Sequence, residues 1–479
     1  MKYLYGASVQ GIQDFIMKTN ELKPIIGASE LVDRICTSMF DEFTSRCKDR
    51  VENIVRAAGN IRVIFHSKDD CAEAYRNFPR KVMLAAPGIT ISQAVVCLED
   101  DCEYAAAADE LEVRLKVERN RPVRPLYPGL LGMMRAQKTG EPAVAYEHDE
   151  YIDLATRRKN DALRIGRQQD YSALVEKAFG RQVEKLLVDN DELAGERGWL
   201  AVVHADGNGF GRIVQKLGGD KVLFPKLSVG IDECTRDAFR DAVANMFSEQ
   251  DIIPIRPLVL SGDDVTFICR GDIALEFTDR FLECFETMTK ERMSEFAKES
   301  EQYADLLSSG LTACAGIAFM KPSYPFFYAY DLAESLCHAA KVDTKAKSSG
   351  QVPNSCLMFY KIQDSVIYDW KNMAERELGY KGGTFLFGPY YTEKVFDDRW
   401  TVADLLNVSM SLKSNNNIKT AVRKWISLMY SDTGKAEQYA ERVRLVNGAR
   451  ASELFAKVTV HEGERCPAYD VLTCVTLSK

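Results

Sequence analysis

Residues 259–267 read VLSGDDVTF, and this stretch decides the fold of the region around it. Apolar residues flank a tight turn made of Ser261, Gly262, Asp263 and Asp264. Two short apolar runs joined by a glycine-containing turn predict a β-hairpin. Such residues are ordinary at a hairpin tip, but two adjacent carboxylates there also suit a metal site.

A second acidic turn lies upstream in the chain. Residues 199–205 (WLAVVHA) predict a buried strand, and residues 206–211 (DGNGFG) follow it directly. A strand that delivers an Asp into a glycine-rich turn can hold a metal ion beside phosphate groups. Asp206, Asp263 and Asp264 together would suffice for two divalent ions about 3.5–4 Å apart and an in-line phosphoryl displacement. We predict these three as catalytic residues, although either turn alone is more often plain loop chemistry.

Length and composition limit the possible classes of protein. The chain has 479 residues, 46% of them hydrophobic and 28% charged, which suggests a globular protein of about three domains. The net charge of −8 argues against a dedicated nucleic-acid-binding surface and leaves direct nucleic-acid contact open. No apolar run approaches the ~18 residues of a membrane span, and no signal-peptide pattern is present, so we expect a cytoplasmic location and no membrane contact.

Apolar periodicity predicts the same order of elements twice. The first copy has predicted strands at 2–9, 53–57, 61–66 and 89–98, and helices at 11–17, 28–43, 67–84 and 103–117. The second copy begins at Trp199 and has its hairpin at 255–269, a last strand at 311–319, and helices at 231–247, 274–298 and 328–341. The order βαββαβ is that of a ferredoxin-like palm, and its repetition suggests an internal duplication.

We therefore predict an α+β fold with two ferredoxin-like (βαββαβ) palm domains, a helical connector and a helical C-terminal domain. The predicted boundaries are 1–120 for the first palm, 121–196 for the connector, 197–365 for the second palm and 366–479 for the C-terminal domain. The hairpin of the first palm reads Ala57, Ala58, Gly59 and Asn60. Because it offers no carboxylate, we predict that the first palm binds no metal ion in the manner of the second.

Five separated motifs occur in the order found in one protein family. The chain resembles the palm-domain large subunit (polymerase/cyclase, GGDD-type) of type III CRISPR effector complexes, a relative of GGDEF nucleotidyl cyclases. The motifs that carry the resemblance are VQGIQDFI (9–16) with GASELV (27–32), HADGNGFG (204–211), LSGDD (260–264), CAGIAFMKPSYPF (314–326) with LAESLCHAAK (332–341), and residues 355–362. The resemblance covers about residues 1–365 and continues more weakly to the end.

The resemblance implies an enzyme that makes cyclic oligoadenylates from ATP with two Mg²⁺ or Mn²⁺ ions, in antiviral defence. The metal ligands would be Asp206, Gly207, Asp263 and Asp264. The two palms would hold two nucleotides between them, with a nucleotide-binding set of Gly207, Asn208, Gly209, Phe210, Gly211, Ser261, Gly262, Lys341, Gln10 and Gln13.

Two of these assignments have a structural alternative. Lys341, at the predicted end of a helix, would pair with phosphate, although a cation there equally suits the helix dipole. Gln10 and Gln13 would lie in the place equivalent to residues 206–209, where a helix-start role is an equal alternative.

The chain also departs from the family pattern at three points. Ser261 replaces the first glycine of GGDD, which is tolerable if that position needs no positive φ. Residues 139–143 resemble the cysteine-containing insert of the family without its cysteines, and no CxxC pair occurs among the 13 cysteines, so we expect no structural zinc. The family's N-terminal HD nuclease domain has no counterpart before the first predicted strand, so we expect a short form without that activity.

Three functions stay open at this point. The first is the cyclic oligoadenylate synthase, the second a GGDEF-like mono- or dinucleotide cyclase. The third is a non-catalytic scaffold subunit of an RNA-guided complex, in which the palms only dock other proteins. Nucleoside triphosphates are the expected ligands in the first two cases. Other subunits of an effector complex, or further copies of this chain, are the expected protein partners.

Overall fold

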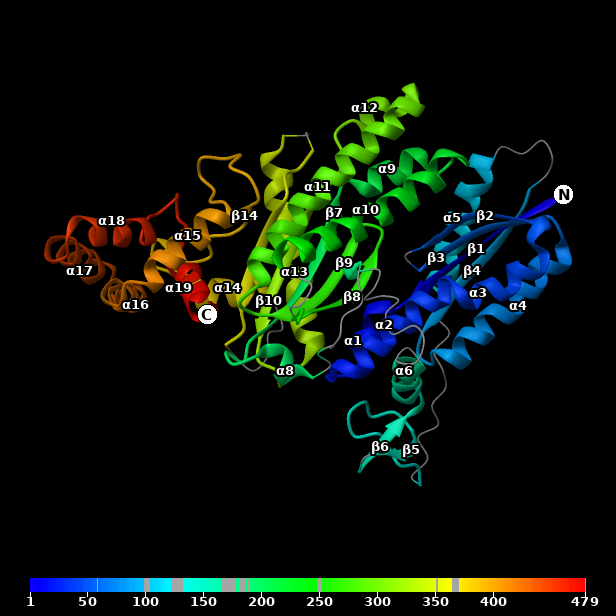
Figure 1. The fold of residues 1–479 in the computed structure, drawn as a ribbon, viewed down its shortest axis with the longest axis horizontal. Coiled ribbons are helices and arrows are strands. Elements are labelled where there is room, and N and C mark those ends of the chain that lie inside the picture. The colour runs from blue at the N-terminus through cyan, green and yellow to red at the C-terminus, as the bar shows by residue number, and fades with distance from the viewer. Residues whose placement is uncertain are drawn as a thin grey trace.

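The computed structural model has the α+β fold predicted from the sequence (Figure 1). It describes residues 1–57, 59–98, 104–121, 132–147, 149–165, 178–180, 187, 189–247, 252–349, 352–363 and 370–478. The two palms lie side by side, with the C-terminal helices at the far end of the second palm (Figure 1). Both predicted palms are therefore present, each built on its own sheet.

The first palm is an antiparallel sheet in the order β2-β3-β1-β4. Its strands are β1 (Lys2–Gln10), β2 (Val51–Ala57), β3 (Asn60–Phe65) and β4 (Thr90–Leu98). One face packs on α5 (Tyr104–Arg119) through Leu4, Val96 and Leu111. The other face contributes Tyr5 and Phe65 to the main core. That side carries α1 (Ile12–Met17), α2 (Leu22–Cys36), α3 (Ser38–Thr44), a 3-10 turn at Ser45–Arg50 and α4 (Lys68–Ala85).

The predicted single helix over residues 28–43 is wrong. The helical hydrogen bonding is interrupted at Thr37, where φ is −100° and ψ is −101°, so α2 and α3 are separate helices. Apolar spacing continues across the break, and for that reason periodicity alone did not reveal it.

The second palm is a six-stranded sheet in the order β14-β11-β10-β7-β9-β8. Its strands are β7 (Leu200–Asn208), β8 (Ile255–Ser261), β9 (Asp264–Arg270), β10 (Thr312–Met320), β11 (Cys356–Lys361) and β14 (Tyr390–Tyr391). The β10-β7-β9-β8 part repeats the β4-β1-β3-β2 order of the first palm, whereas β11 adds in parallel to β10. The helices are α9 (Phe210–Leu217), α10 (Leu223–Met246), α11 (Ala274–Glu299), a 3-10 turn at Glu301–Tyr303, α12 (Ala304–Leu307) and α13 (Phe326–Lys347).

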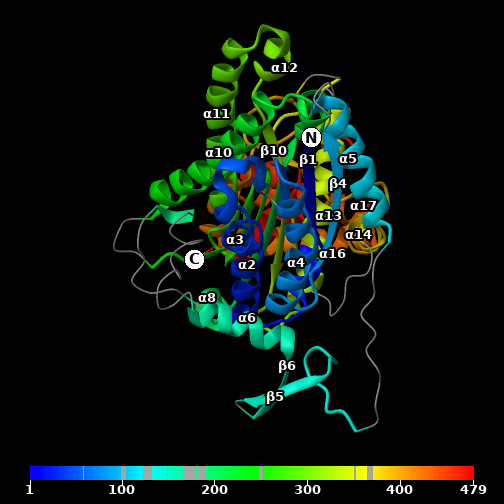
Figure 2. The ribbon, with the colours of Figure 1, turned by 90° about the vertical axis from the view of Figure 1, so that its right-hand side faces the viewer.

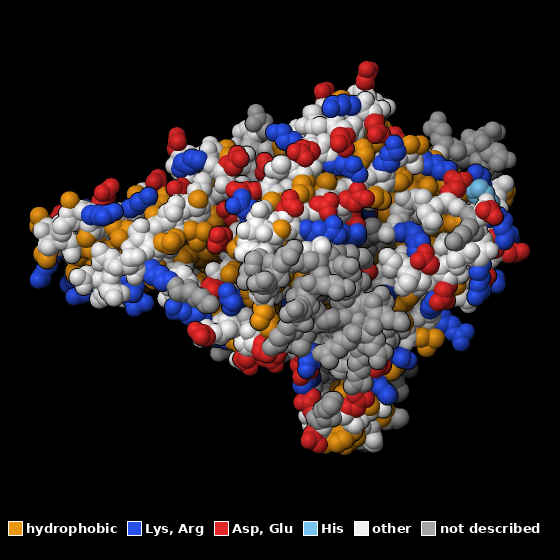
Figure 3. All heavy atoms as spheres, in the orientation of Figure 1, with side chains coloured by type: hydrophobic (Ala, Val, Ile, Leu, Met, Phe, Trp, Pro, Cys, Tyr) orange, Lys and Arg blue, Asp and Glu red, His pale blue; other side chains and the backbone are white. Residues whose placement is uncertain are grey.

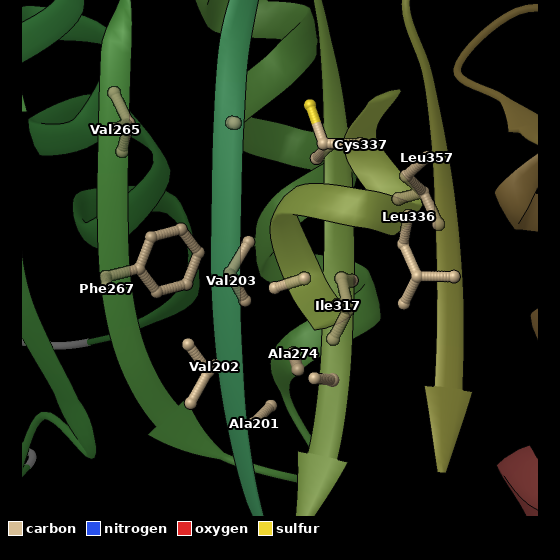
Figure 4. Close-up of a cluster of buried hydrophobic side chains, with 14 of the residues drawn as sticks. Ala201, Val202, Val203, Val265, Phe267, Ala274, Ile317, Leu336, Cys337 and Leu357 are labelled. Carbon is tan, nitrogen blue, oxygen red and sulfur yellow. The ribbon is translucent and has the colours of Figure 1, made fainter. Parts of the chain in front are cut away.

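Small residues allow α13 to lie close to the sheet of the second palm. Figure 4 shows Ile317 of β10 and Leu336 of α13 in the same buried cluster as Val203 and Phe267. A Cβ atom on Gly316 would lie 1.9 Å from the carbonyl oxygen of Ala333, so only glycine permits this approach. The close packing fixes the height of α13 above β7, the strand that bears Asp206.

The connector is more than helical. Besides α6 (Leu154–Ile165) and α8 (Asn190–Ala194), it contains a hairpin of β5 (Ala143–Glu147) and β6 (Glu150–Asp153) that projects from the body of the molecule (Figures 1 and 2). Helix α6 packs on α2, where a Cβ atom on Gly27 would lie 1.9 Å from the carbonyl oxygen of Lys159. The sequence-based connector prediction missed the hairpin.

The C-terminal region is mainly helical, as predicted. Its elements are α14 (Trp370–Leu378), β12 (Gly379–Tyr380), β13 (Gly383–Thr384), α15 (Val402–Lys413), α16 (Asn416–Ser431), α17 (Thr433–Val446), α18 (Ala449–Val458) and α19 (Ala468–Leu477). On the face shown in Figure 3, hydrophobic side chains gather on the lobe that these helices form. Within the described residues, no helix combines the length and apolar character that crossing a membrane requires.

Polar contacts join the two palms directly. Ser29 of α2 donates a hydrogen bond to the carbonyl oxygen of Leu258 on β8. Glu52 of β2 pairs with Lys221, which lies just before α10. The hydrogen bond from Lys221 is the main cause that lowers the pKa of Glu52 to about 2. The hairpin of the second palm is thus held against α2 of the first.

Candidate active site

The first acidic turn follows from a buried strand and a left-handed glycine. β7 is buried along nearly its whole length and ends at Asp206, Gly207 and Asn208. Gly209 then adopts φ 87° and ψ −5° and caps the start of α9. Residues with a Cβ atom rarely adopt this conformation, so the glycine allows the chain to turn sharply from strand to helix.

The second acidic turn touches the first through backbone and side chain. Gly262 has φ 62°, which the tight β8-β9 turn requires. The N–H of Gly207 donates to the carbonyl oxygen of Asp263 over 3.1 Å. A Cβ atom on Gly207 would lie 2.7 Å from the Cβ atom of Asp263. Glycine at position 207 therefore permits the two turns to meet.

The register of the sheet brings the three predicted carboxylates together. β7 and β9 are antiparallel neighbours, and Asp206 lies directly opposite Asp264. Asp263 precedes Asp264 at the tip of the same hairpin. The structure thus places Asp206, Asp263 and Asp264 at one end of one sheet.

Lys341 is the cation that faces this cluster. Its Nζ atom bonds to Oδ2 of Asp206 and, over 2.9 Å, to the carbonyl oxygen of Gly207. The prediction that Lys341 ends its helix is wrong, since α13 continues to Lys347. Its position inside α13 and its contacts make Lys341 a counter-ion of Asp206, and a role at the helix dipole falls away.

The carboxylates repel one another in a partly desolvated site. Burial, followed by the charge of Asp206, raises the pKa of Asp263 to about 6. Burial, followed by the charges of Asp206, Asp263 and Glu334, raises the pKa of Asp264 to about 7. The Asp264 side chain keeps 39% of its surface exposed, but its Oδ1 atom is buried and has no hydrogen-bond partner among the described residues.

Aromatic and imidazole groups lie behind Asp264. The Nδ1 atom of His204 lies 3.6 Å from Oδ1 of Asp264 and 3.3 Å from Oγ1 of Thr266. Burial lowers the pKa of His204 to about 4, so the ring is neutral at pH 7. Its ring meets that of Tyr330 edge to face, with centroids 5.5 Å apart. Because His204 is neutral, the carboxylates are left without compensation from that side.

The donor set fits a hard divalent cation. Carboxylate and carbonyl oxygens are the ligands that Mg²⁺ and Mn²⁺ prefer, and the buried Oδ1 atom of Asp264 lacks the partner that a buried charged oxygen needs. Lys341 engages both Asp206 and the carbonyl of Gly207. In this arrangement, no group of three His, Cys, Asp or Glu side chains among the described residues is placed to hold a metal ion, and the Lys341 ammonium occupies the Asp206 side of the cluster.

A pocket of about 310 Å³ lies between the two palms beside this cluster. The second palm contributes Ser261, Asp264 and Arg236 to its lining. The first palm contributes Gly11, Gln13, Ser29, Asp33, Arg56 and Gly59, among others. Both palms therefore line one cavity that reaches the acidic hairpin.

The first palm repeats the geometry of the second without its carboxylates. Gly11 caps α1 with φ 66°, as Gly209 caps α9, and the N–H of Val9 donates to the carbonyl oxygen of Gly59 over 2.8 Å. Counting back from the two glycines places Ser8 where the second palm has Asp206. In register, Ser8 lies opposite Asn60, as Asp206 lies opposite Asp264. Ala58 of the predicted hairpin lies outside the described residues.

The same comparison corrects the predicted place of the glutamines. Gln10 and Gln13 correspond to Asn208 and Gly211, two positions beyond the predicted equivalence. Gln13 lines the inter-palm pocket. Gln10 is absent from the described lining of that pocket, and its amide group bonds to Ser8, with Oγ at 3.2 Å. The two glutamines therefore have different environments.

The remaining predicted nucleotide-binding residues fall into two groups. Asn208 is buried, and its amide donates to Thr312 and Cys314 of β10, so its side chain serves the sheet. Phe210 packs against the core from the first turn of α9. Gly207, Gly209, Gly211 and Gly262 have no side chain to offer, and any contact with a nucleotide would come from their backbone.

Sequence reasoning missed polar residues on neighbouring helices. Asp232 and Thr235 of α10 bond to Gly262, and Glu334 of α13 adds negative charge near Asp264. The sequence carried one signal for them: Asp232 and Thr235 occupy positions of the apolar pattern of α10 that face the core, and the structure shows both to be buried. A buried polar side chain needs a partner, and here that partner is the hairpin turn.

Comparisons with known proteins agree with this architecture. Residues 199–349 match the family model for the second palm domain of Cas10/Cmr2. No curated protein matches the chain.

Solved structures match in fold across the whole chain. The crystal structure of a Csm1-Csm4 cassette in complex with pppApA is 15% identical with a TM-score of 0.56, and the match covers 100% of this chain and 69% of that one. A Csm1-Csm4 cassette in complex with cA4 is 14% identical with a TM-score of 0.55, and the match covers 99% of this chain and 69% of that one. Csm1 in T. onnurineus is 14% identical with a TM-score of 0.54, and the match covers 100% of this chain and 70% of that one. The predicted resemblance to the palm-domain large subunit of type III complexes is thereby confirmed, in residues 199–349 by the Cas10/Cmr2 second palm family and over the chain by the fold of Csm1.

Proposed function

We propose that this chain is a metal-dependent nucleotidyltransferase that makes cyclic oligoadenylates from ATP in antiviral defence. The observation that carries the proposal is the register that sets Asp206 opposite Asp264, with Asp263 beside them, where Asp264 lines a pocket shared by both palms. Clustered carboxylates at the end of a buried strand are costly for stability unless a cation compensates them.

The chemistry needs no nucleophile from the protein. The 3′-hydroxyl of one nucleotide attacks the α-phosphorus of the other, a new P–O bond forms, the bond to pyrophosphate breaks, and the hydroxyl proton passes to solvent. Mg²⁺ or Mn²⁺, held by Asp206, Asp263, Asp264 and the Gly207 carbonyl, would neutralise charge on the phosphate oxygens. Lys341 would add a second positive charge for the triphosphate next to Asp206.

The first palm would hold the acceptor nucleotide. Its pocket lining brings Gln13 and Arg56 to face Ser261 and Asp264 across one cavity. Joining two nucleotides requires both to be held within near-attack distance, and a cavity bounded by two palms suits this requirement. The Ser8 and Asn60 pair, which replaces Asp206 and Asp264, supports a binding role without a metal of its own.

The solved relatives support both substrate and partner. Structures of the Csm1-Csm4 cassette include complexes with one ATP, pppApA, cA3 and cA4. We infer the same class of substrate here, and a partner subunit of an effector complex in the cytoplasm. A GGDEF-like mono- or dinucleotide cyclase would use the same carboxylates, and its products would differ in size.

Incubation of the pure protein with each labelled nucleoside triphosphate and Mg²⁺ or Mn²⁺ tests the proposal. Mass spectrometry should detect cyclic oligoadenylates with ATP and release of one pyrophosphate for each bond formed. Cyclic mono- or dinucleotides alone would establish the cyclase alternative. If no product forms with the chain alone or with its partner subunits, the proposal is contradicted and the scaffold function is favoured.

A further inference from the structure

Helix α10 holds the peptide groups on both sides of the Gly262 Cα atom. The carboxylate of Asp232 accepts a hydrogen bond from the N–H of Gly262 over 3.1 Å. The hydroxyl of Thr235 is within donating distance of two carbonyl oxygens, that of Gly262 and, over 3.0 Å, that of Ile231 one turn earlier on α10. Residues three apart lie on one face of a helix, so the two side chains grip the turn from one direction.

The two α10 side chains that make these contacts are buried, and Gly262 itself is partly buried. Thr235 is fully buried and Asp232 is 7% exposed, although most of the residues that α10 turns toward the core are apolar. A backbone group that loses a hydrogen-bond partner away from water costs about 1–3 kcal/mol, so the turn depends on these two side chains, whereas Thr235 and Asp232 each have a second partner, Ile231 and Arg236. A hairpin tip is ordinarily a mobile element, and here it is anchored.

The same carboxylate also holds a cation of the inter-palm pocket. The second oxygen of Asp232 pairs with the guanidinium of Arg236, one helical turn further along α10. Arg236 lines the pocket together with Ser261 and Asp264. Asp232 thus links the hairpin that bears Asp263 and Asp264 to a positive group in the pocket wall.

We propose that Asp232 and Thr235 are positioning residues that fix the acidic hairpin of the nucleotidyl-transfer site. The inference rests on the proposed function and adds to it the element that sets the geometry of Asp263 and Asp264. Groups that bind a transition state must be held within about 0.5 Å, and they are usually locked by hydrogen bonds from surrounding residues. Thr235 fixes the turn alone, whereas Asp232 fixes the turn and Arg236.

Paired substitutions at Thr235 separate its hydroxyl from its shape. Thr235→Val keeps the size and removes the donor, and Thr235→Ser keeps the donor. We expect Thr235→Val to raise the hydrogen-exchange rate of peptides spanning 258–267 and to lower kcat, each by about tenfold, because one buried acceptor loses its partner. KM should stay within about threefold, because Thr235 faces the turn and not the pocket. Thr235→Ser should restore both quantities. Thr278→Val is the matched control, since Thr278 is also fully buried but its hydroxyl has no hydrogen-bond partner within the described chain.

Asp232 gives a second, independent readout. Asp232→Asn keeps an oxygen for the N–H of Gly262 and loses the charge that holds Arg236. We therefore expect normal exchange in the hairpin and a KM for ATP raised about tenfold, the value of one charge-assisted bond. Asp232→Ala should show both the fast exchange and the raised KM.

The possible outcomes distinguish a failure of the positioning role of Asp232 and Thr235 from a failure of the proposed function. If Thr235→Val keeps protection and kcat while Thr235→Ser loses them, shape and not the hydroxyl matters, and the inference is overturned. If the wild-type protein forms no product, the proposed function fails. Titration of Mn²⁺ by calorimetry then tests separately whether Asp232 and Thr235 position the acidic hairpin. Weaker Mn²⁺ binding by Thr235→Val, restored in Thr235→Ser, then supports positioning of the carboxylates, and equal binding by all three proteins overturns it.

Discussion

Asp206 and Asp264 lie opposite each other on neighbouring antiparallel strands, although 57 residues separate them in the chain. A shift of one residue in the register of β7 and β9 would turn one of the two side chains to the other face of the sheet. The hydrogen bond from Gly207 to Asp263 closes the same contact one position further. Strand pairing therefore brings the three carboxylates together, and they lie close to one another only when the sheet is formed.

The first prediction concerns the hairpin carboxylates. Asp263→Ala combined with Asp264→Ala should lower nucleotide turnover at least about 100-fold, since a preorganised charge clamp commonly contributes this much. The melting temperature should not fall, because neither side chain fills the core. Asp237→Ala is the control, since Asp237 is an exposed carboxylate on α10 that pairs with Arg240. Full activity in the double variant would remove these residues from the mechanism.

A second prediction concerns Lys341. Lys341→Met should raise the KM for ATP about tenfold, because a charged partner of phosphate is lost. Its affinity for Mn²⁺ should stay the same or increase, since the ammonium that opposes a cation at Asp206 is gone. Steady-state kinetics and calorimetry measure the two effects. Lys345→Met, on the exposed side of the same helix, should change neither; a loss of Mn²⁺ affinity in Lys341→Met would contradict the assignment.

A third prediction concerns the pH dependence of stability. Burial raises the pKa of Asp470 from 3.8 to about 7, although the hydroxyl of Tyr390 donates to its carboxyl group over 2.7 Å. The folded chain then keeps a proton that the unfolded chain releases, so the contribution of this group to stability falls as pH rises from about 4 to about 7. Each tenfold difference in proton affinity corresponds to about 1.4 kcal/mol.

Asp470→Asn removes this titration. Between pH 5 and pH 8 the melting temperature of the wild type should fall relative to that of the variant, because only the wild type must bury a group that ionises. Asp432→Asn is the control: capping of α17 lowers the pKa of the exposed Asp432, so its contribution to stability is lost only below about pH 4 and the trend between pH 5 and pH 8 should not change. Parallel melting curves for wild type and Asp470→Asn across this range would show that Asp470 ionises freely in the folded protein.

Local sequence determines much of the fold and of the candidate site. Buried strands, turn glycines and helical apolar spacing predicted both palms, because each signal lies within about ten residues. The three carboxylates were predictable for the same reason, since each lies at or beside the end of a strand and within three residues of a glycine with positive φ. The motifs of the second palm lie within residues 199–349, which match the family model for the second palm domain of Cas10/Cmr2.

What escaped prediction depends on contacts between distant segments. The parallel addition of β11 to β10 joins segments that a whole helix separates, and two buried polar residues on α10 acquire meaning only beside Gly262. The length of α13 beyond Lys341 was underestimated because polar residues follow that position. Because Lys341 was placed at the end of α13, its charge was attributed to phosphate or to the helix dipole, and its ion pair with Asp206 was not predicted.

The last prediction tests whether the first palm contributes to catalysis. Gln13 lines the inter-palm pocket opposite Ser261 and Asp264, whereas Gln10 bonds to Ser8 within its own palm. Gln13→Ala should therefore raise the KM for ATP severalfold or shift products toward short linear species, because the acceptor nucleotide loses a hydrogen-bond partner. Gln10→Ala, three residues away on the same turn, is the matched control and should leave kinetics unchanged. Both variants should bind Mn²⁺ as the wild type does, since the proposed metal ligands Asp206, Asp263 and Asp264 all belong to the second palm. If Gln13→Ala makes the same products with the same kinetics, the first palm supports the second only structurally, and a single palm performs the chemistry.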